Sequence, residues 1–160
     1  MEQFKIEINV KVLQFNELSV EDKELIECAQ RATYNSYANY SHFYVGAALR
    51  MDNNEIQIGA NQENAAFPSG VCAERSAIFA AQSTHPEQSI STLAIAARND
   101  KGYISTPITP CGACRQVILE IEERYKKPVR ILLYGEHCIY QLDSIKDLLP
   151  LAFVDKTMIF

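Results

Sequence analysis

Three cysteines stand at the starts of two segments that we expect to be helical. Cys72 belongs to the stretch Cys-Ala-Glu-Arg, while Cys111 and Cys114 belong to Pro-Cys-Gly-Ala-Cys. Three thiolates can hold a zinc ion and leave its fourth tetrahedral position to water, an arrangement typical of catalytic sites. Two cysteines three positions apart at a helix start share one face and can grip one ion. We therefore expect these side chains to bind one Zn²⁺ per chain.

A carboxylate follows two positions after the first of these cysteines. Glu74 could carry protons to and from water at such a metal. Two residues at this spacing point roughly 160° apart around a helix axis, so Cys72 and Glu74 cannot share a site on its side. They can share one if the helix aims its N-terminal end at the metal. That orientation also brings the positive end of the helix dipole to the thiolates.

Charge at this centre needs compensation. Zn²⁺ with three thiolates carries a net charge of −1, which weakens it as a Lewis acid. Arg75 is the nearest cation in the sequence and could donate hydrogen bonds to the sulfur atoms. We expect it to compensate the thiolates.

Other interpretations of these residues remain open. A single Cys-x-x-Cys pair also occurs in redox sites and in structural zinc sites, and Glu74 could simply cap its helix. A histidine could complete a closed structural site, and the chain has three: His42, His85 and His137. Cys28 and Cys138 lack a metal-like spacing and are expected to be ordinary core or surface residues.

Length, net charge and cysteine count indicate what kind of protein this is. The 160 residues favour a single domain over 1–160, and the net charge of −5 without a basic tract disfavours a nucleic-acid polymer as partner. We predict no signal sequence and no membrane span. The odd count of five cysteines argues against a disulfide framework, so the expected location is the cytoplasm.

Periodicity predicts strands alternating with helices, and hence a layered α/β domain whose sheet is covered by helices. The expected strands are 4–12, 43–51, 55–60, 92–97 and 129–134. The expected helices are 19–38, 72–82, 111–125 and a short one at 144–149, with a loop over 98–110.

Five stretches in order resemble the cytidine deaminase family, in its compact three-cysteine form that is usually homotetrameric. They are Tyr40–Leu49, Asn61–Ala65, Cys72–Arg75, Pro110–Gln116 and Leu148–Phe153. The resemblance covers most of the chain, from about residue 25 to 153. It implies a three-layer α-β-α sandwich with a mixed central sheet of about five strands. Residues 1–18 would form a strand-like N-terminal extension, which could cover a sheet edge or contribute to an interface.

The resemblance also implies roles for single residues. The three cysteines would bind zinc and Glu74 would shuttle protons. Asn61 and Glu63 would bind the ribose hydroxyls, and their alternate spacing on an extended segment puts both on one face. Phe43 would pack on the pyrimidine ring, and Phe153 would reach into a neighbouring subunit's site. From the sequence alone, Asn61 and Glu63 could also be a solvated strand end, and Phe43 a core residue.

The implied reaction is hydrolytic deamination of cytidine and 2′-deoxycytidine to uridine and 2′-deoxyuridine, with release of ammonia, as in pyrimidine salvage. Two departures from the family's pattern stand out: Asn39 and Phe67 occupy positions where proline and tyrosine are common. Three other zinc deaminases are alternative assignments with the same chemistry: blasticidin, deoxycytidylate and polynucleotide deaminases. A noncatalytic zinc-binding assembly module is the alternative from a different class of function.

Overall fold

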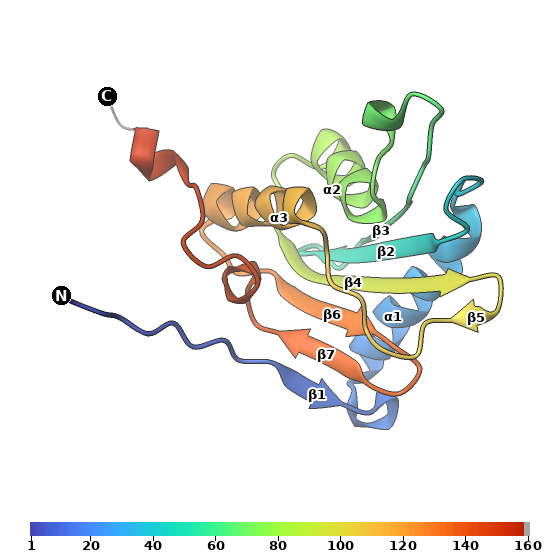
Figure 1. Ribbon diagram of the computed structural model, residues 1–160, viewed down its shortest axis with the longest axis horizontal. Coiled ribbons are helices and arrows are strands. Elements are labelled where there is room, and N and C mark those ends of the chain that lie inside the picture. Colours follow the sequence, from blue (N-terminus) through green and yellow to red (C-terminus); the bar gives the residue numbers. More distant parts are fainter. Residues whose placement is uncertain (159–160) are drawn as a thin grey trace.

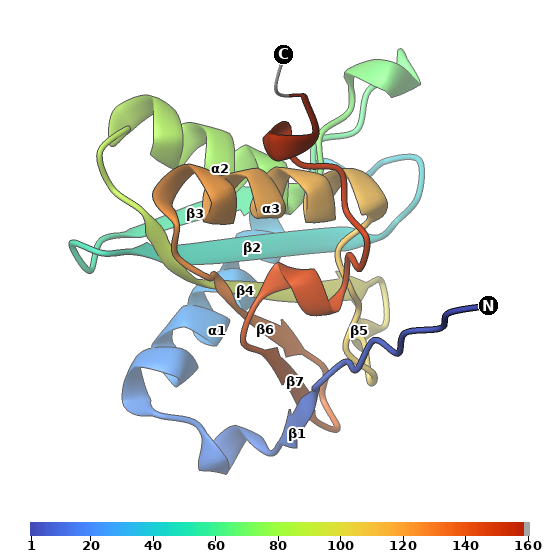
Figure 2. The same cartoon turned by 90° about the vertical axis from the view of Figure 1, so that its left-hand side faces the viewer.

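The structure is a computed structural model that describes residues 1–158 of the chain. Its centre is a mixed sheet of seven strands with helices on both faces (Figures 1 and 2). The strands are β1 (Lys11–Leu13), β2 (Tyr44–Met51), β3 (Ile56–Ala60), β4 (Ile90–Asn99), β5 (Gly102–Tyr103), β6 (Arg130–Tyr134) and β7 (Ile139–Leu142). The helices are α1 (Val20–Ala32), α2 (Ala73–Thr84) and α3 (Gly112–Tyr125).

Two apolar cores separate three layers and confirm the predicted α-β-α sandwich. One face of the sheet packs against α1, through buried residues such as Leu25, Ile26 and Ala29. The opposite face packs against α2 and α3, and its core includes Ile78 and Ile118. In Figure 2, α2 and α3 lie above the sheet and α1 lies below it.

Strand directions bring the starts of α2 and α3 to the same edge of the sheet. The sheet order is β1-β7-β6-β4-β2-β3, with β5 paired to the end of β4. Because β2 is antiparallel to both β3 and β4, these two strands run the same way, and β4 is also parallel to β6. Helix α2 follows β3 and α3 follows β4, so both helices begin beyond the carboxyl ends of their strands, the usual place for a site in such sheets.

Several boundaries differ from the predictions. The sheet has seven strands rather than about five, because β5 and β7 are too short to stand out in the sequence pattern. The predicted strand 4–12 shrinks to β1, since residues 4–10 have no strand to pair with in this chain. The first helix continues only as a 3₁₀ turn at Thr33–Asn35, and the last predicted helix is a 3₁₀ turn at Ile145–Asp147.

Candidate active site

The three predicted metal ligands come together at the starts of α2 and α3. The sulfur atoms of Cys72, Cys111 and Cys114 all lie within 4.8 Å of one another. The Sγ–Sγ separation is 3.8 Å between Cys72 and Cys111 and 3.5 Å between Cys111 and Cys114. Among the described residues, no histidine or carboxylate joins this cluster. Three sulfur donors without a fourth protein ligand suit a zinc ion with one open position.

Helix ends position these sulfur atoms. Cys72 is the N-cap of α2 and Cys111 is the N-cap of α3, while Cys114 lies in the first turn of α3. The orphan amides of both first turns, and the positive ends of both helix dipoles, therefore lie beside the cluster and favour thiolates there. The end-on geometry expected from the Cys-Ala-Glu spacing is the geometry observed.

A close approach between helix and sheet fixes the first turn of α2. Gly59 in β3 lies directly under this turn, and a Cβ atom added at Gly59 would meet the Ala77 amide nitrogen and the Ala73 carbonyl. Only a residue without a side chain allows this contact. The packing holds the segment that carries Cys72 and Glu74 at a fixed depth above the sheet.

Glu74 lies in the first turn of α2 and is buried, with 5 % of its surface exposed. Burial, as the largest cause, and the nearby Cys72 raise the pKa of its carboxyl above the usual range, against a hydrogen bond from its own backbone amide. A carboxyl that is easily protonated and lies beside the three cysteines suits proton transfer.

Arg75 lies against the cluster from the next position. Its Nη2 donates to Cys72 Sγ at 3.8 Å, and its buried Nε has no hydrogen-bond partner among the described residues. The thiolate raises the pKa of the guanidinium. A cation with an unpartnered buried donor fits a centre that holds extra negative charge.

Hydrogen bonds within the cluster shift the pKa values of two of its thiols in opposite directions. Hydrogen bonds from Cys114, Arg75 and Cys111 lower the pKa of Cys72 to about 5, with the bond from Cys114 as the largest cause. The same bond and burial raise the pKa of Cys114. Cys72 therefore forms a thiolate more readily than Cys114. Metal ligation requires thiolates, so binding of a dication would favour the deprotonated cluster.

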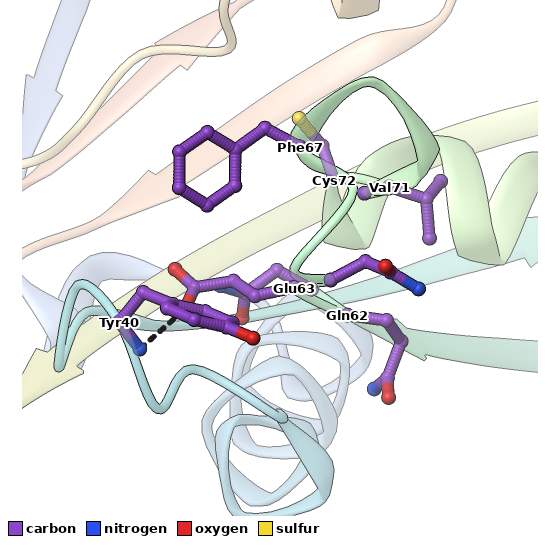
Figure 3. A pocket seen from close by; sticks show the side chains of 9 residues that line it. Tyr40, Gln62, Glu63, Phe67, Val71 and Cys72 are labelled. Atoms are coloured by element: carbon purple, nitrogen blue, oxygen red, sulfur yellow. Dashed lines mark hydrogen bonds between the residues drawn. The ribbon is translucent and has the colours of Figure 1, made fainter.

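A cavity of about 310 Å³ opens beside Cys72. Its lining consists of polar side chains, two aromatic rings and one carboxylate: Tyr40, Asn61, Gln62, Glu63, Asn64, Phe67, Gly70, Val71 and Cys72. The rings of Tyr40 and Phe67 meet edge to face, with 5.8 Å between their centroids. In Figure 3, Phe67 and Cys72 lie on one side of the cavity, and Tyr40 and Glu63 lie on the other. The volume is at the lower end of the range for small-molecule sites.

Glu63 lines this cavity and is held by a loop. Its carboxylate accepts hydrogen bonds from the Tyr40 amide at 2.9 Å, the Ser41 amide at 3.3 Å and the Ser41 hydroxyl (Figure 3 shows the first). The Ser41 hydroxyl, as the largest cause, and these amides lower the pKa of Glu63. The side chain is an oriented, ionised acceptor at the cavity wall.

Asn61 is the second predicted sugar ligand, and it also lines the cavity. Its Oδ1 accepts from the Val45 amide at 2.8 Å and from the Ser36 hydroxyl, while Nδ2 donates to the Phe43 carbonyl at 3.0 Å. An amide nitrogen carries two hydrogens, so one N–H is available for a ligand. The chain itself thus fixes the orientation of this side chain.

The two predicted aromatic contacts lie outside this lining. Phe43 is half-buried at the start of β2, and its backbone bonds to Asn61 and Ser41. Phe153 has 62 % of its surface exposed, and its carbonyl accepts a hydrogen bond from Gln116 at 3.0 Å. Within one chain, neither ring meets the cavity.

Sequence reasoning did not single out Tyr40, Gln62 and Phe67 as cavity residues. The available signal was their place inside or beside stretches that carry the resemblance, since Tyr40 opens one of them. The edge-to-face pair of Tyr40 and Phe67 joins two loops far apart in sequence, and no periodic pattern predicts such a contact.

Comparisons with known proteins agree with this geometry. Residues 19–129 match the family described as cytidine and deoxycytidylate deaminase zinc-binding region. The chain is 37% identical over 134 residues to a cytidine deaminase from Halalkalibacterium halodurans, covering 84% of this chain and 95% of that protein. It is 42% identical over 98 residues to one from Sporosarcina psychrophila, covering 61% and 68%.

Solved structures of cytidine deaminases have a similar fold. A cytidine deaminase from Burkholderia pseudomallei superposes with a TM-score of 0.70 at 36% identity, covering 81% of this chain and 97% of that one. A cytidine deaminase from Mycobacterium tuberculosis superposes with a TM-score of 0.66 at 29% identity, covering 85% and 99%. The chain therefore belongs to the cytidine and deoxycytidylate deaminase family of zinc-dependent hydrolytic enzymes.

Proposed function

We propose that this protein deaminates cytidine and 2′-deoxycytidine hydrolytically, giving uridine and 2′-deoxyuridine with release of ammonia. The observation that carries the proposal is the convergence of Cys72, Cys111 and Cys114 at two helix ends, beside a cavity that ends at Glu63. The cluster would supply the chemistry and the cavity would supply the recognition of a nucleoside.

The three thiolates would hold a Zn²⁺ ion, which would supply a lowered pKa of about 7 to a water molecule at its open position. Glu74 would accept a proton from this water and deliver it to ring N3 of the cytosine. The water oxygen would bond to C4 as the C4=N3 double bond opens and N3 takes that proton. Glu74 would then carry the proton of the new C4 hydroxyl to the exocyclic amine, so that the C4–N bond breaks, a C4=O bond forms and ammonia leaves. The burial of Glu74 supports this role, because it excludes bulk water from the proton's path.

The cavity favours an uncharged sugar over a phosphate. Glu63 would accept a hydrogen bond from a ribose hydroxyl, and the free N–H of Asn61 would donate to a ribose oxygen. The residues that line the cavity include no lysine or arginine, and an ionised Glu63 would repel a phosphate group. This lining argues for a nucleoside over deoxycytidylate or an oligonucleotide.

Arg75 would compensate the charge of the thiolates.

The predicted contacts of Phe43 and Phe153 need either a bound substrate or a second chain. Phe43 would pack on the pyrimidine ring. Phe153 would complete a neighbouring subunit's site. Its exposure, and that of Leu151 at 81 %, support a contact outside the chain.

We propose a homotetramer with shared active sites, acting in cytoplasmic pyrimidine salvage. Among helices of the described residues, none has the length and hydropathy of a membrane span.

A substrate panel tests the proposal. The zinc-loaded protein is assayed spectrophotometrically with cytidine, 2′-deoxycytidine, dCMP, blasticidin S and a short single-stranded oligonucleotide. We expect turnover of the two nucleosides and at least a hundredfold lower kcat/KM for dCMP and the oligonucleotide. A preference for dCMP would overturn the assignment of a nucleoside substrate. Zinc-loaded protein that is inert towards every cytosine compound would support a noncatalytic module.

A further inference from the structure

The first ten residues form an arm whose residues are all exposed among the described residues. In both views of the ribbon, this N-terminal arm (residues 1–10) leaves the body of the molecule as an extended segment (Figures 1 and 2). Its even positions from Phe4 to Val10 are apolar and exposed, with Phe4 at 77 % and Ile8 at 52 %. Lone apolar side chains are common on surfaces, but a regular row of them marks an interaction site.

The arm continues the outermost strand of the sheet. β1 pairs with β7 on one side only, and the sheet order leaves its other edge open. An open edge offers unpaired amides and carbonyls to another strand. Val10 and Val12 line an apolar cavity of about 370 Å³ with Leu133, Tyr140, Leu142 and others, so the even face of the arm lies on the α3 side of the sheet.

We propose that the arm pairs antiparallel with the arm and β1 of a second copy of this chain, about a two-fold axis at Asn9. Each arm would add a strand to the open β1 edge of the other copy, which would join two sheets into one. The contact is isologous, since the same segment serves on both sides. It differs from the Phe153 contact of the proposed tetramer and does not depend on the proposed function.

Side-chain alternation limits the possible registers. A register that pairs even with odd positions would place apolar residues opposite polar ones on both faces. The two-fold axis must therefore lie midway between two equivalent residues, so that position n of one copy faces position n of the other. We call this an axis at residue n. In that arrangement at Asn9, Val10 faces Ile8 and Val12 faces Ile6, which extends the apolar row.

Charge selects residue 9 among these axes. With the axis at residue 9, Glu7 of each copy faces Lys11 of the other, and opposite charges across a pair stabilise it. An axis at residue 7 or 11 puts identical charges face to face, and an axis at residue 8 opposes Lys5 and Lys11. An axis at residue 10 brings no opposite charges together, whereas the axis at residue 9 forms two Glu7–Lys11 pairs and leaves Lys5 opposite Leu13. An axis at residue 6 would pair Lys5 with Glu7 but would leave Val12 and Leu13 of β1 without a partner.

Contacts within the chain are compatible with this pairing. Lys5 Nζ binds Glu7 Oε1 at 3.0 Å, which places both side chains on the odd face of the arm. Lys11 Nζ binds Asp143 Oδ2 at 2.9 Å, also on this face. An ammonium group has three donors, so Lys11 can donate to Asp143 and to Glu7 of the partner subunit at the same time.

Disulfide trapping tests the arm pairing directly. Directly opposed residues of an antiparallel pair have Cα atoms about 4.5–5.5 Å apart, within the range that a disulfide spans. We expect the Asn9→Cys variant to form a covalent dimer under mild oxidation, with the 9–9 link found by peptide mapping. A mixture of Glu7→Cys and Lys11→Cys chains should cross-link to each other, while Glu7→Cys alone should not.

Controls separate this result from other causes. The wild-type chain, oxidised alongside, reports cross-linking by its five native cysteines. Deletion of residues 2–10 should lower the particle mass in sedimentation equilibrium to that of the assembly held by the remaining contacts, with zinc content unchanged as a sign of intact folding. An uncross-linked Asn9→Cys variant, or an unchanged mass after the deletion, would overturn the proposal. Efficient self-cross-linking of Glu7→Cys would overturn the register.

Discussion

The helical wall of the candidate site and its loop wall hold their side chains differently. The helical wall consists of Cys72, Glu74, Cys111 and Cys114, all at the starts of α2 and α3. The loop wall consists of Tyr40, Glu63 and Phe67, held by hydrogen bonds and a ring contact between short segments. Tertiary packing fixes the first wall, and local polar contacts fix the second.

This difference separates two tasks. Groups that do chemistry must be held before substrate arrives, and helix ends packed on a sheet supply that rigidity. Groups that recognise a ligand can lie on loops, which a scaffold positions with more freedom. We therefore expect changes in the helical wall to act on metal content and kcat, and changes in the loop wall to act on KM.

The largest expected effect is the loss of a sulfur ligand. Cys114→Ala should lose most of its zinc and more than about a thousandfold in turnover, because acidification of water depends on the ion. Metal analysis and the cytidine assay measure both. Cys138→Ser is the matched control outside the cluster and should keep metal and activity. Full activity of zinc-free Cys114→Ala would remove the metal from the account.

A change in the loop wall should act on recognition. Glu63→Gln keeps the size of the side chain but removes the charged acceptor, and a hydrogen bond to a charged group is worth about 1.5–3 kcal/mol. We expect KM for cytidine to rise about 10- to 100-fold with a smaller change in kcat. Steady-state kinetics measure KM and kcat separately. A loss confined to kcat would contradict the assignment of substrate recognition to the loop wall.

Packing beneath the helical wall can be tested without touching a functional group. Gly59→Ala places a methyl group against the first turn of α2 and should lower the free energy of unfolding by about 1–3 kcal/mol. Gly112→Ala adds the same methyl group where no atom lies within 4 Å, and should change stability by less than about 0.5 kcal/mol. Equal denaturation midpoints for the two variants would refute the role of the close contact.

The smallest expected effect comes from the guanidinium beside the cluster. Arg75→Gln removes the positive charge next to Cys72 and should lower kcat by less than about tenfold, with zinc still bound. Arg75→Lys, which keeps the charge, should recover part of the activity. Unchanged turnover in the glutamine variant would exclude Arg75 from charge compensation.

The sequence predicted the helical wall well because its signals are local. The Cys-Ala-Glu spacing implied an end-on helix, and α2 presents Cys72 and Glu74 in that way. Alternating strands and helices also predicted the layers. In the loop wall only Glu63 was expected, through the family resemblance. The Tyr40–Phe67 contact was not, since it depends on how two irregular segments meet.

Short or unpaired strands limited the fold prediction. β5 and β7 have 2 and 4 residues, too few for a clear alternating pattern. Residues 4–12 have a strong pattern, yet only Lys11–Leu13 form a strand in the single chain. Alternation predicts the capacity to pair, and the partner strand has to come from elsewhere. In the proposed arm pairing, a second copy of the chain provides that partner strand.

The most direct test of the account is the Glu74→Gln variant, assayed with cytidine beside the wild-type protein and a zinc count on both. Glutamine keeps the shape of the side chain and cannot move a proton. We predict equal zinc content, a similar KM and a kcat lower by about 10²- to 10⁴-fold. A zinc-loaded variant that turns over cytidine at the wild-type rate would contradict the assignment of Glu74 as the proton carrier.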